Sequence, residues 1–285
     1  MRLLKLAGVV FVALLIIAAG AAVVLWWQIR AAPAFYRRYS WTEPQRSVLN
    51  QQAVNNMLTV QKSAQEIYYG AIRARRTGTG DGDAETGQQS SQPVTLTLTE
   101  EQANAFITHN GEVFSHIQDR YAHLFTEPAI FFRNGRIILA GRIRRPECLA
   151  SLHYRVGLDN QGRLYAVLER TMAGRVPAPP GILEGRMQRA AESLSPSIEA
   201  WKRQAKMDDA GGMNSAAVCA GLGMMLRDVA AGRPVPAVVF VPVDDKGTAL
   251  PMKITAVGVQ EDALTISAVP MRREERTALL ARIKS

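Results

Sequence analysis

The stretch AIFFRNGRIILAGRIRR, residues 129–145, decides the fold. Two runs with a period of two flank Asn134-Gly135, the residue pair typical of a two-residue β-hairpin turn. The same pattern recurs at Leu152 to Leu158 and at Leu164 to Met172, on either side of a polar turn. We therefore expect four consecutive antiparallel strands in the middle of the chain.

Helical and strand patterns alternate in blocks on both sides of these strands. A capping box formed by Thr99 and Gln102 predicts a helix that ends near Asn110-Gly111. Further strands are expected at 94–98, 237–243, 252–259 and 263–269, and further helices at 45–76, 112–124, 181–207 with a break at Ser195-Pro196, 215–230 and 273–284. Strands in runs separated by a helical block favour an α+β fold with one mostly antiparallel, curved sheet packed with helices.

The N-terminal part contains an apolar run from Leu6 to Trp27, 22 residues without a charge. A run of this length can cross a bilayer as a helix, so we expect an N-terminal transmembrane helix. A cleaved signal peptide is the alternative, because Arg2 and Lys5 precede the run and Ala19 to Ala21 resembles a cleavage site. The organisation expected is an anchor at 1–30, a juxtamembrane segment and helix at 31–76, a linker at 77–93 and an α+β domain at 94–285.

Two features of the juxtamembrane region carry specific expectations. The aromatic and basic stretch from Phe35 to Trp41 is expected at the level of lipid headgroups. The residues Ala53, Met57, Val60, Ala64, Ile67 and Ala71 form one stripe on the helix that follows. This stripe predicts packing over a sheet, with a coiled-coil dimer as the alternative.

Three segments carry a resemblance to a known group of proteins. They are LTEEQANAFI at 98–107, FFRNGRIILAGRI at 131–143 and AGRVPAPPGIL at 173–183. With the expected anchor, they resemble bacterial membrane-anchored proteins of unknown function, including the YpmS-like family. The resemblance implies an anchor followed by a curved antiparallel sheet with helices, and it carries over no catalytic residue.

A basic sheet face is the candidate binding site. The odd positions Ile137, Leu139, Gly141 and Ile143 are expected to face inward, which turns Arg136, Arg142 and Arg144 outward together. His153 and Arg155 extend this face from the next strand. An anionic lipid or an acidic protein partner is the ligand class that such a face indicates, and edge protection with solubility is the alternative.

Other candidate chemistry is weaker. His109, Glu112, His116, Asp119 and His123 recur at helical spacing, as metal ligands, a pH-sensitive surface or a solvated polar face would. Cys148 and Cys219 could form one disulfide or could be two unrelated buried thiols. The sequence contains no motif of a catalytic, phosphate-binding or zinc site, and we expect no cofactor and no metal.

These observations predict a membrane-tethered, extracytoplasmic binding or assembly module without catalytic activity. The net charge of +9 suits contact with anionic lipid or with another envelope protein, and the expected location outside the cytoplasm argues against nucleic acid. The expected location is the cell membrane, with one span and the N-terminus in the cytoplasm. An envelope hydrolase with an unrecognised site and a structural spacer that dimerises through its first helix are the alternatives.

Overall fold

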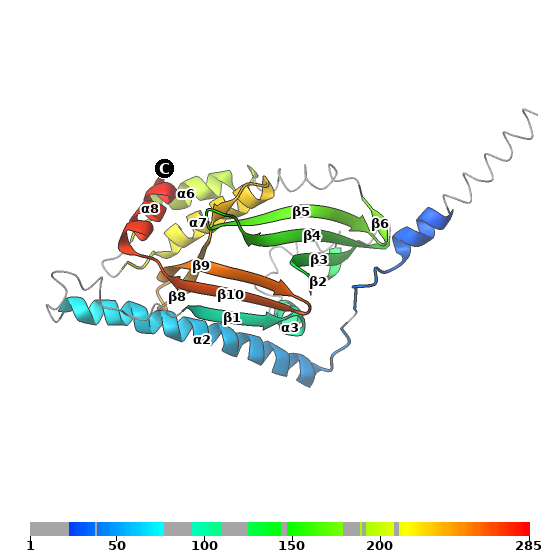
Figure 1. Ribbon diagram of the computed structural model, residues 1–285, viewed down its shortest axis with the longest axis horizontal. Helices are drawn as coiled ribbons and strands as arrows, with labels where there is room; N and C mark the ends of the chain where they lie inside the picture. Colours follow the sequence, from blue (N-terminus) through cyan, green and yellow to red (C-terminus); the bar gives the residue numbers. More distant parts are fainter. Residues whose placement is uncertain are drawn as a thin grey trace, which may run out of the picture.

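The computed structural model describes residues 23–37, 39–76, 93–109, 125–143, 147–178, 189, 192–207 and 211–285. The fold is α+β with antiparallel sheets, as expected, but the strands form two sheets rather than one. Figure 1 shows the two sheets beside each other, with a long helix along one side and three helices at one end.

The expected transmembrane helix requires a correction. Residues 6–22 of the apolar run lie outside the described residues, and residues 23–30 are helical. Among the described helices, none is both long and apolar enough to cross a membrane. The part of the chain that the structure describes is therefore α+β, and no helix in it is the spanning helix that hydropathy suggested.

Sheet B contains the four predicted central strands. Its order is β2 (Phe125–Arg133), β3 (Arg136–Ile143), β4 (Cys148–Leu158), β5 (Arg163–Ala173) and β6 (Val176–Pro177), and β7 (Val235–Pro236) pairs with β5. All these pairs are antiparallel. The predicted turn lies at Asn134 and Gly135, which have φ angles of 44° and 79°. Asn and Gly tolerate this left-handed conformation, so the hairpin closes without strain.

Sheet A joins the two ends of the domain. Its order is β1 (Val94–Thr99), β10 (Ala263–Pro270), β9 (Ala249–Gln260) and β8 (Val238–Pro242). The early strand β1 pairs along its whole length with the late strand β10, from Val94 opposite Ala268 to Thr99 opposite Ala263. Side chains of sheets A and B meet in one apolar cluster that contains Phe132 and Val259.

The long helix α2 (Glu43–Arg76) covers one face of sheet A (Figure 1). Ala64 and Tyr68 are buried against Leu250 and Met252 of β9. Ala53 and Ala64 of the predicted stripe are fully buried. Packing over a sheet is therefore confirmed, and these stripe residues are covered within the monomer.

Four shorter helices of the described domain pack around the sheets. Helix α3 (Glu100–His109) follows β1 directly, and the predicted capping box is present, since Thr99 N–H donates to Gln102 Oε1 at 3.1 Å and Gln102 N–H donates to Thr99 Oγ1 at 3.2 Å. Helices α6 (Ser195–Gln204), α7 (Ser215–Ala230) and α8 (Arg273–Lys284) gather at one end of the sheets (Figure 1). Their core contains Met213, Ala217 and Leu279, packed with Val238 of β8.

Candidate anion-binding face

One face of sheet B collects the predicted basic residues. In the antiparallel register Arg136 lies opposite Arg155, Ile138 lies opposite His153 and Arg142 lies opposite Leu149. Partners in a ladder point to the same face of a sheet, so Arg136, Arg142, His153 and Arg155 share one face. Arg144, the fourth predicted arginine, lies outside the described residues.

Two residues of β5 belong to this face that sequence analysis missed. Arg170 lies opposite His153, whereas Glu169 has no partner on β4 because the register shifts between His153 and Tyr154. A β-bulge of this kind re-aims a side chain. Here the Glu169 carboxylate bridges the guanidinium groups of Arg136 and Arg155. A residue that leaves the period of two gives no signal in the pattern, so the sequence could not reveal it.

The arginines of this face are partly neutralised but remain accessible. Arg136 Nε lies 2.6 Å from Glu169 Oε2, and Arg142 Nε lies 3.5 Å from Glu127 Oε2. The side chains of Arg136, Arg142 and Arg155 are 44%, 43% and 56% exposed. The hydrogen bond from Arg136 holds the pKa of the Glu169 carboxyl below its ordinary value. Exposed pairs of this type contribute little to stability and can exchange partners.

The middle of the same face is covered, contrary to the expected inward and outward positions. Ile138 and Ala140 are buried, whereas Leu139, expected inside, is 38% exposed. A strap, which we define as residues 33–41, lies over this apolar middle through Phe35, Tyr36 and Tyr39. The ring centroids of Phe35 and Phe131 are 5.5 Å apart and those of Tyr36 and Phe131 are 5.6 Å apart.

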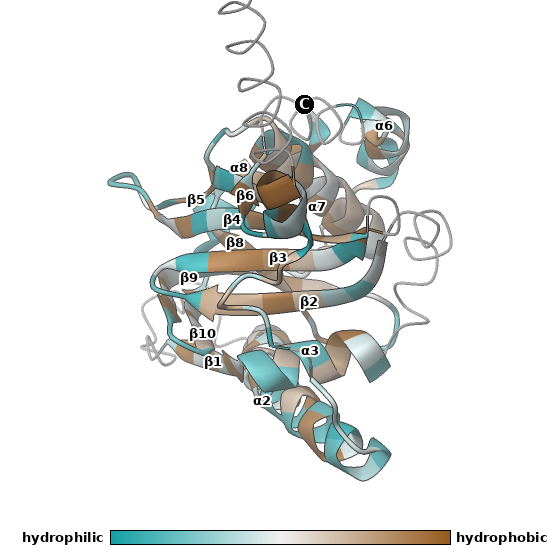
Figure 2. Ribbon diagram, turned by 90° about the vertical axis from the view of Figure 1, so that its right-hand side faces the viewer, coloured by the Kyte–Doolittle hydropathy of each residue, from teal (hydrophilic) through white to brown (hydrophobic). Residues whose placement is uncertain are grey.

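These aromatic residues were expected at lipid headgroups; the structure instead packs Phe35, Tyr36 and Tyr39 on sheet B, and their position relative to a membrane stays a prediction. The sequence could not show that the apolar middle of β2 and β3, visible in Figure 2 between hydrophilic strand ends, needed a cover. An apolar strip in the centre of an open sheet face gains from burial, and the aromatic side chains of the strap, which is distant in the sequence from β2 and β3, provide that burial. The arginines consequently remain at the two ends of the face.

The strap also covers a buried serine and a half-buried histidine. Ser151 Oγ lies 3.1 Å from His153 Nε2, and the His153 ring meets Phe35 edge-on with centroids 5.3 Å apart. Burial, together with Arg170 and Arg136, lowers the pKa of His153, so the ring is neutral at pH 7. Ser151 is only 1% exposed. This contact gives the buried Ser151 hydroxyl a hydrogen-bond partner, which is the ordinary role of such a pair.

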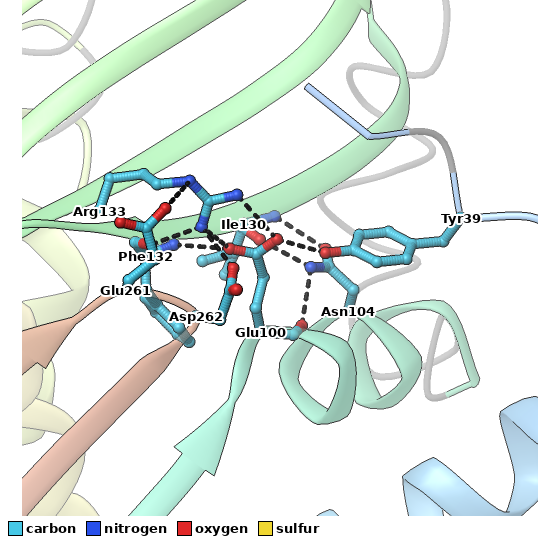
Figure 3. Close-up of polar contacts among 8 residues, drawn as sticks. All are labelled: Tyr39, Glu100, Asn104, Ile130, Phe132, Arg133, Glu261 and Asp262. Carbon is cyan, nitrogen blue, oxygen red and sulfur yellow. Dashed lines mark hydrogen bonds and ion pairs between the residues drawn. The ribbon is translucent and has the colours of Figure 1, made fainter. Parts of the chain in front are cut away.

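A second polar cluster holds the strap and both sheets together (Figure 3). Glu100 is 1% exposed. Its carboxylate accepts hydrogen bonds from the Tyr39 hydroxyl, from the Phe132 backbone N–H at 3.0 Å and from the Arg133 guanidinium. Asp262, in the turn between β9 and β10, lies 2.8 Å from Arg133 Nη1. We call these residues the Glu100 node.

Charges within the Glu100 node stabilise one another. Burial disfavours the charge of Arg133, but Glu100, Asp262 and Glu261 outweigh this effect and raise its pKa. Burial and the hydrogen bond to Glu100 raise the pKa of the Tyr39 hydroxyl far above its ordinary value. Tyr39 therefore stays protonated and donates to Glu100, which ties the strap to the start of α3.

Asn104 of α3 protects the free edge of β2 beside this node. Its Oδ1 accepts from Ile130 N–H at 2.8 Å, and its Nδ2 donates to Ile130 C=O at 2.6 Å. An amide side chain thus replaces a neighbouring strand at an edge that would otherwise be open. The amide and the node make β2 rigid, and β2 carries the Phe131 that lies beneath the strap.

The apolar residues 23–30 lie beside sheet B (Figure 1). Arg175, in the turn after β5, donates its backbone N–H to Gln28 C=O at 3.0 Å and its Nε to Ala32 C=O at 3.0 Å. Trp26 and Trp27 are 48% and 62% exposed, and the Arg30 guanidinium lies 4.5 Å from the centre of the Trp26 ring. The turn that holds this segment contacts Leu149, whose ladder partner is Arg142.

The remaining predicted residues take no part in this face. Cys148 is buried at the start of β4 and Cys219 lies half-buried on α7, and both thiols are free. Burial raises the pKa of the Cys148 thiol. Of the helical histidine series, His109 ends α3 and the others lie outside the described residues. No set of three or more His, Cys, Asp or Glu that could hold a metal ion occurs within the part of the chain that the structure describes.

Comparison with known proteins adds no relative to this picture. No protein-family model, no characterised protein and no solved structure matches the chain. The resemblance to YpmS-like proteins stays a prediction, and the functional argument rests on the geometry of the molecule.

Proposed function

We propose that the protein is a non-catalytic binding module that docks on an anionic lipid surface through the arginine-bearing ends of sheet B and the apolar segment at residues 23–30. The observation that carries this proposal is the exposure of Trp26 and Trp27 next to Arg30, on the end of sheet B that also bears Arg142.

Each part of this surface suits a membrane interface. Indole rings favour the headgroup level, where one part of the ring is apolar and another is wet. Arginine near an anionic surface contributes about 1 kcal/mol per residue. An acidic protein would use the arginines equally well, but it would leave exposed an apolar segment that includes Val23, Val24 and Leu25, which are 67%, 59% and 49% exposed. A lipid surface accounts for both features.

Flotation of the purified full chain with neutral and with anionic vesicles, across a salt series, tests the proposal. We expect stronger flotation with anionic vesicles and a loss of the difference at high salt, because screening weakens the arginine contribution. The double variant Arg142→Ala and Arg155→Ala should weaken anionic binding by about 2 kcal/mol in total.

Lys253→Ala is the matched control, because Lys253 is also exposed and paired with one carboxylate, Glu275, at 2.8 Å, but lies on sheet A. This variant should float like the wild type. Equal flotation with both kinds of vesicle, or a double variant that behaves like the control, would refute the lipid proposal. A salt-sensitive complex with an acidic protein in the absence of vesicles would then identify the alternative partner.

A further inference from the structure

Helix α7 has its small residues inside and its large apolar residues outside. Ala217, Ala220, Gly221 and Gly223 are its buried residues. Leu222 and Leu226 are 46% and 60% exposed and lie one turn apart. A surface helix normally presents a polar outer face. Residues 215–226 contain no charged side chain.

Close packing explains the small residues. A Cβ atom at Gly223 would lie 2.7 Å from Ile198 Cγ1 of α6, and one at Gly221 would lie 2.9 Å from Phe240 Cζ of β8. Larger side chains therefore fit only on the outer face of α7. Packing does not explain why Leu222 and Leu226 are apolar. Both side chains are largely exposed, so polar residues would fit these positions equally well.

A shallow apolar pocket lies beside this outer face. It is formed between α7, α8 and β8, and its lining includes Met225, Phe240 and Leu279, with Asp228 and Arg282 among the residues that border it. Methionine side chains are flexible and adapt to an inserted apolar group. The pocket is small, with a volume of about 20 Å³, so together with the two exposed leucines it offers an apolar surface with only a shallow hollow.

Positive charge is concentrated at the C-terminal end of α7. The Asp228 carboxylate lies 2.6 Å from Arg233, 3.9 Å from Arg282 and 4.0 Å from Arg227. Cations at this end also offset the helix dipole, which is their ordinary role. Three guanidinium groups nevertheless share one carboxylate, and the side chains of Arg233 and Arg282 are 59% and 51% exposed.

We propose that the outer face of α7 is a docking surface for an acidic amphipathic helix of a partner protein. Apolar side chains of this helix cover Leu222, Leu226 and the mouth of the pocket, and its carboxylates pair with Arg233 and Arg282. Helix-in-groove recognition uses this combination of apolar anchors and flanking charges. The face is about 24 Å long at 1.5 Å per residue, which suits a partner helix of about four turns.

Charge complementarity favours this occupant over a second copy of the chain. The same face of a second copy, laid antiparallel, would bring the uncharged residues 215–226 against Arg233 and Arg282. It would supply no carboxylate to these arginines. An acidic helix supplies both the apolar cover and the missing negative charge.

A pair of synthetic peptides tests the proposal. One peptide is an amphipathic helix with leucine on one face and glutamate on the other, and its match carries lysine in place of glutamate. Fluorescence anisotropy with the purified full chain should show binding of the glutamate peptide only. Leu226→Ser and Arg282→Glu should each weaken binding roughly tenfold, as for a residue at the centre of an interface.

Leu58→Ser is the matched control, because Leu58 is 41% exposed on α2, away from the surface. It should bind the peptide like the wild type, and circular dichroism should confirm that every variant is folded. Absence of binding, equal binding of the lysine peptide, or an unaffected Leu226→Ser variant would overturn the proposal. Self-association of the chain alone that Leu226→Ser abolishes in sedimentation would overturn it in favour of a second copy.

Discussion

Two glutamates of this protein each bind arginine, and their surroundings give them different roles. The Glu100 side chain is 2% exposed and joins Arg133, Tyr39 and the backbone of β2. The Glu169 side chain is 22% exposed and bridges Arg136 and Arg155, whose own side chains are about half exposed. The same ion-pair chemistry thus occurs both inside the molecule and on its surface.

The difference shows which arginines are free to bind a partner. Removal of one member of a buried pair leaves a charge without compensation, so Arg133 depends on Glu100. Water screens the exposed pair, so Arg136 and Arg155 can exchange Glu169 for another anion at little cost. We therefore assign architecture to the Glu100 node and binding to the arginines at the ends of sheet B.

The largest effect is expected for Glu100→Gln. The substitution removes the buried charge that contributes most to compensating Arg133, while Asp262 and Glu261 remain, so the free energy of unfolding should fall by about 3 kcal/mol. Urea denaturation measures this loss, with Glu101→Gln, an exposed neighbour on α3, as the control. A loss no greater than that of the control would contradict the structural role of the node.

A somewhat smaller effect is expected for Asn104→Ala. Without the amide, Ile130 N–H and C=O lose their partners at the edge of β2, which should cost about 2 kcal/mol. Hydrogen exchange should accelerate at the Ile130 amide in particular. Asn55→Ala, on the exposed side of α2, should leave this exchange rate unchanged. If the Ile130 amide of this variant remained protected from exchange, another group would protect the edge of β2 and the role assigned to Asn104 would be wrong.

Acid should weaken the strap side of sheet B through His153. The folded protein lowers the pKa of His153 by burial and by the nearby Arg170 and Arg136, against a weaker opposite effect of Glu169. The unfolded chain therefore binds a proton near pH 6.5 that the folded chain rejects, so the free energy of unfolding falls as the pH drops through this value towards the folded pKa. His153→Gln should flatten this part of the curve in denaturation series between neutral and mildly acidic pH. An unchanged slope would exclude His153 as its source.

The smallest effect on stability is expected for Glu169→Gln, at most about 1 kcal/mol. Its effect on binding should be opposite in sign to that of the arginine variants. Arg136 and Arg155 lose a competing carboxylate, so flotation with anionic vesicles should increase. Weaker flotation of this variant would mean that Glu169 orders the arginines for binding instead of competing for them.

Local features of the sequence predicted much of the fold. Helix α8, the hairpin at Asn134-Gly135 and the capping box of Thr99 and Gln102 depend on contacts between near neighbours, and all three are confirmed. Helix α7 was also expected at 215–230, where the structure has it. Helix and strand propensity, turn-forming residues and helix caps each depend on only a few neighbouring residues, so a single sequence is enough to predict them.

Contacts between distant segments were not readable in the same way. No local signal indicated that β1 pairs with β10, that the strands divide into two sheets, or that Glu100 lies against Arg133. For the candidate site, the period of two placed Arg136, Arg142 and Arg155 on one face. It could not place Glu169, which enters through a bulge, or the strap, which covers the middle of the face.

The pairing of β1 with β10 also sets the order in which the chain can fold during synthesis. The ladder from Val94 to Thr99 has no β10 partner until residues 263–270 emerge from the ribosome, long after β1 itself. Helix α2 likewise cannot pack in its final place until Leu250, Met252 and Ala268 have been synthesised, because these residues form its contact surface. The hairpins of sheet B join consecutive strands and can form early, whereas sheet A can form only after β10 has been synthesised. Pairing between strands so distant in the sequence is slow. A chain that stops short of β10 would leave α2 and β1 uncovered, as a substrate for chaperones.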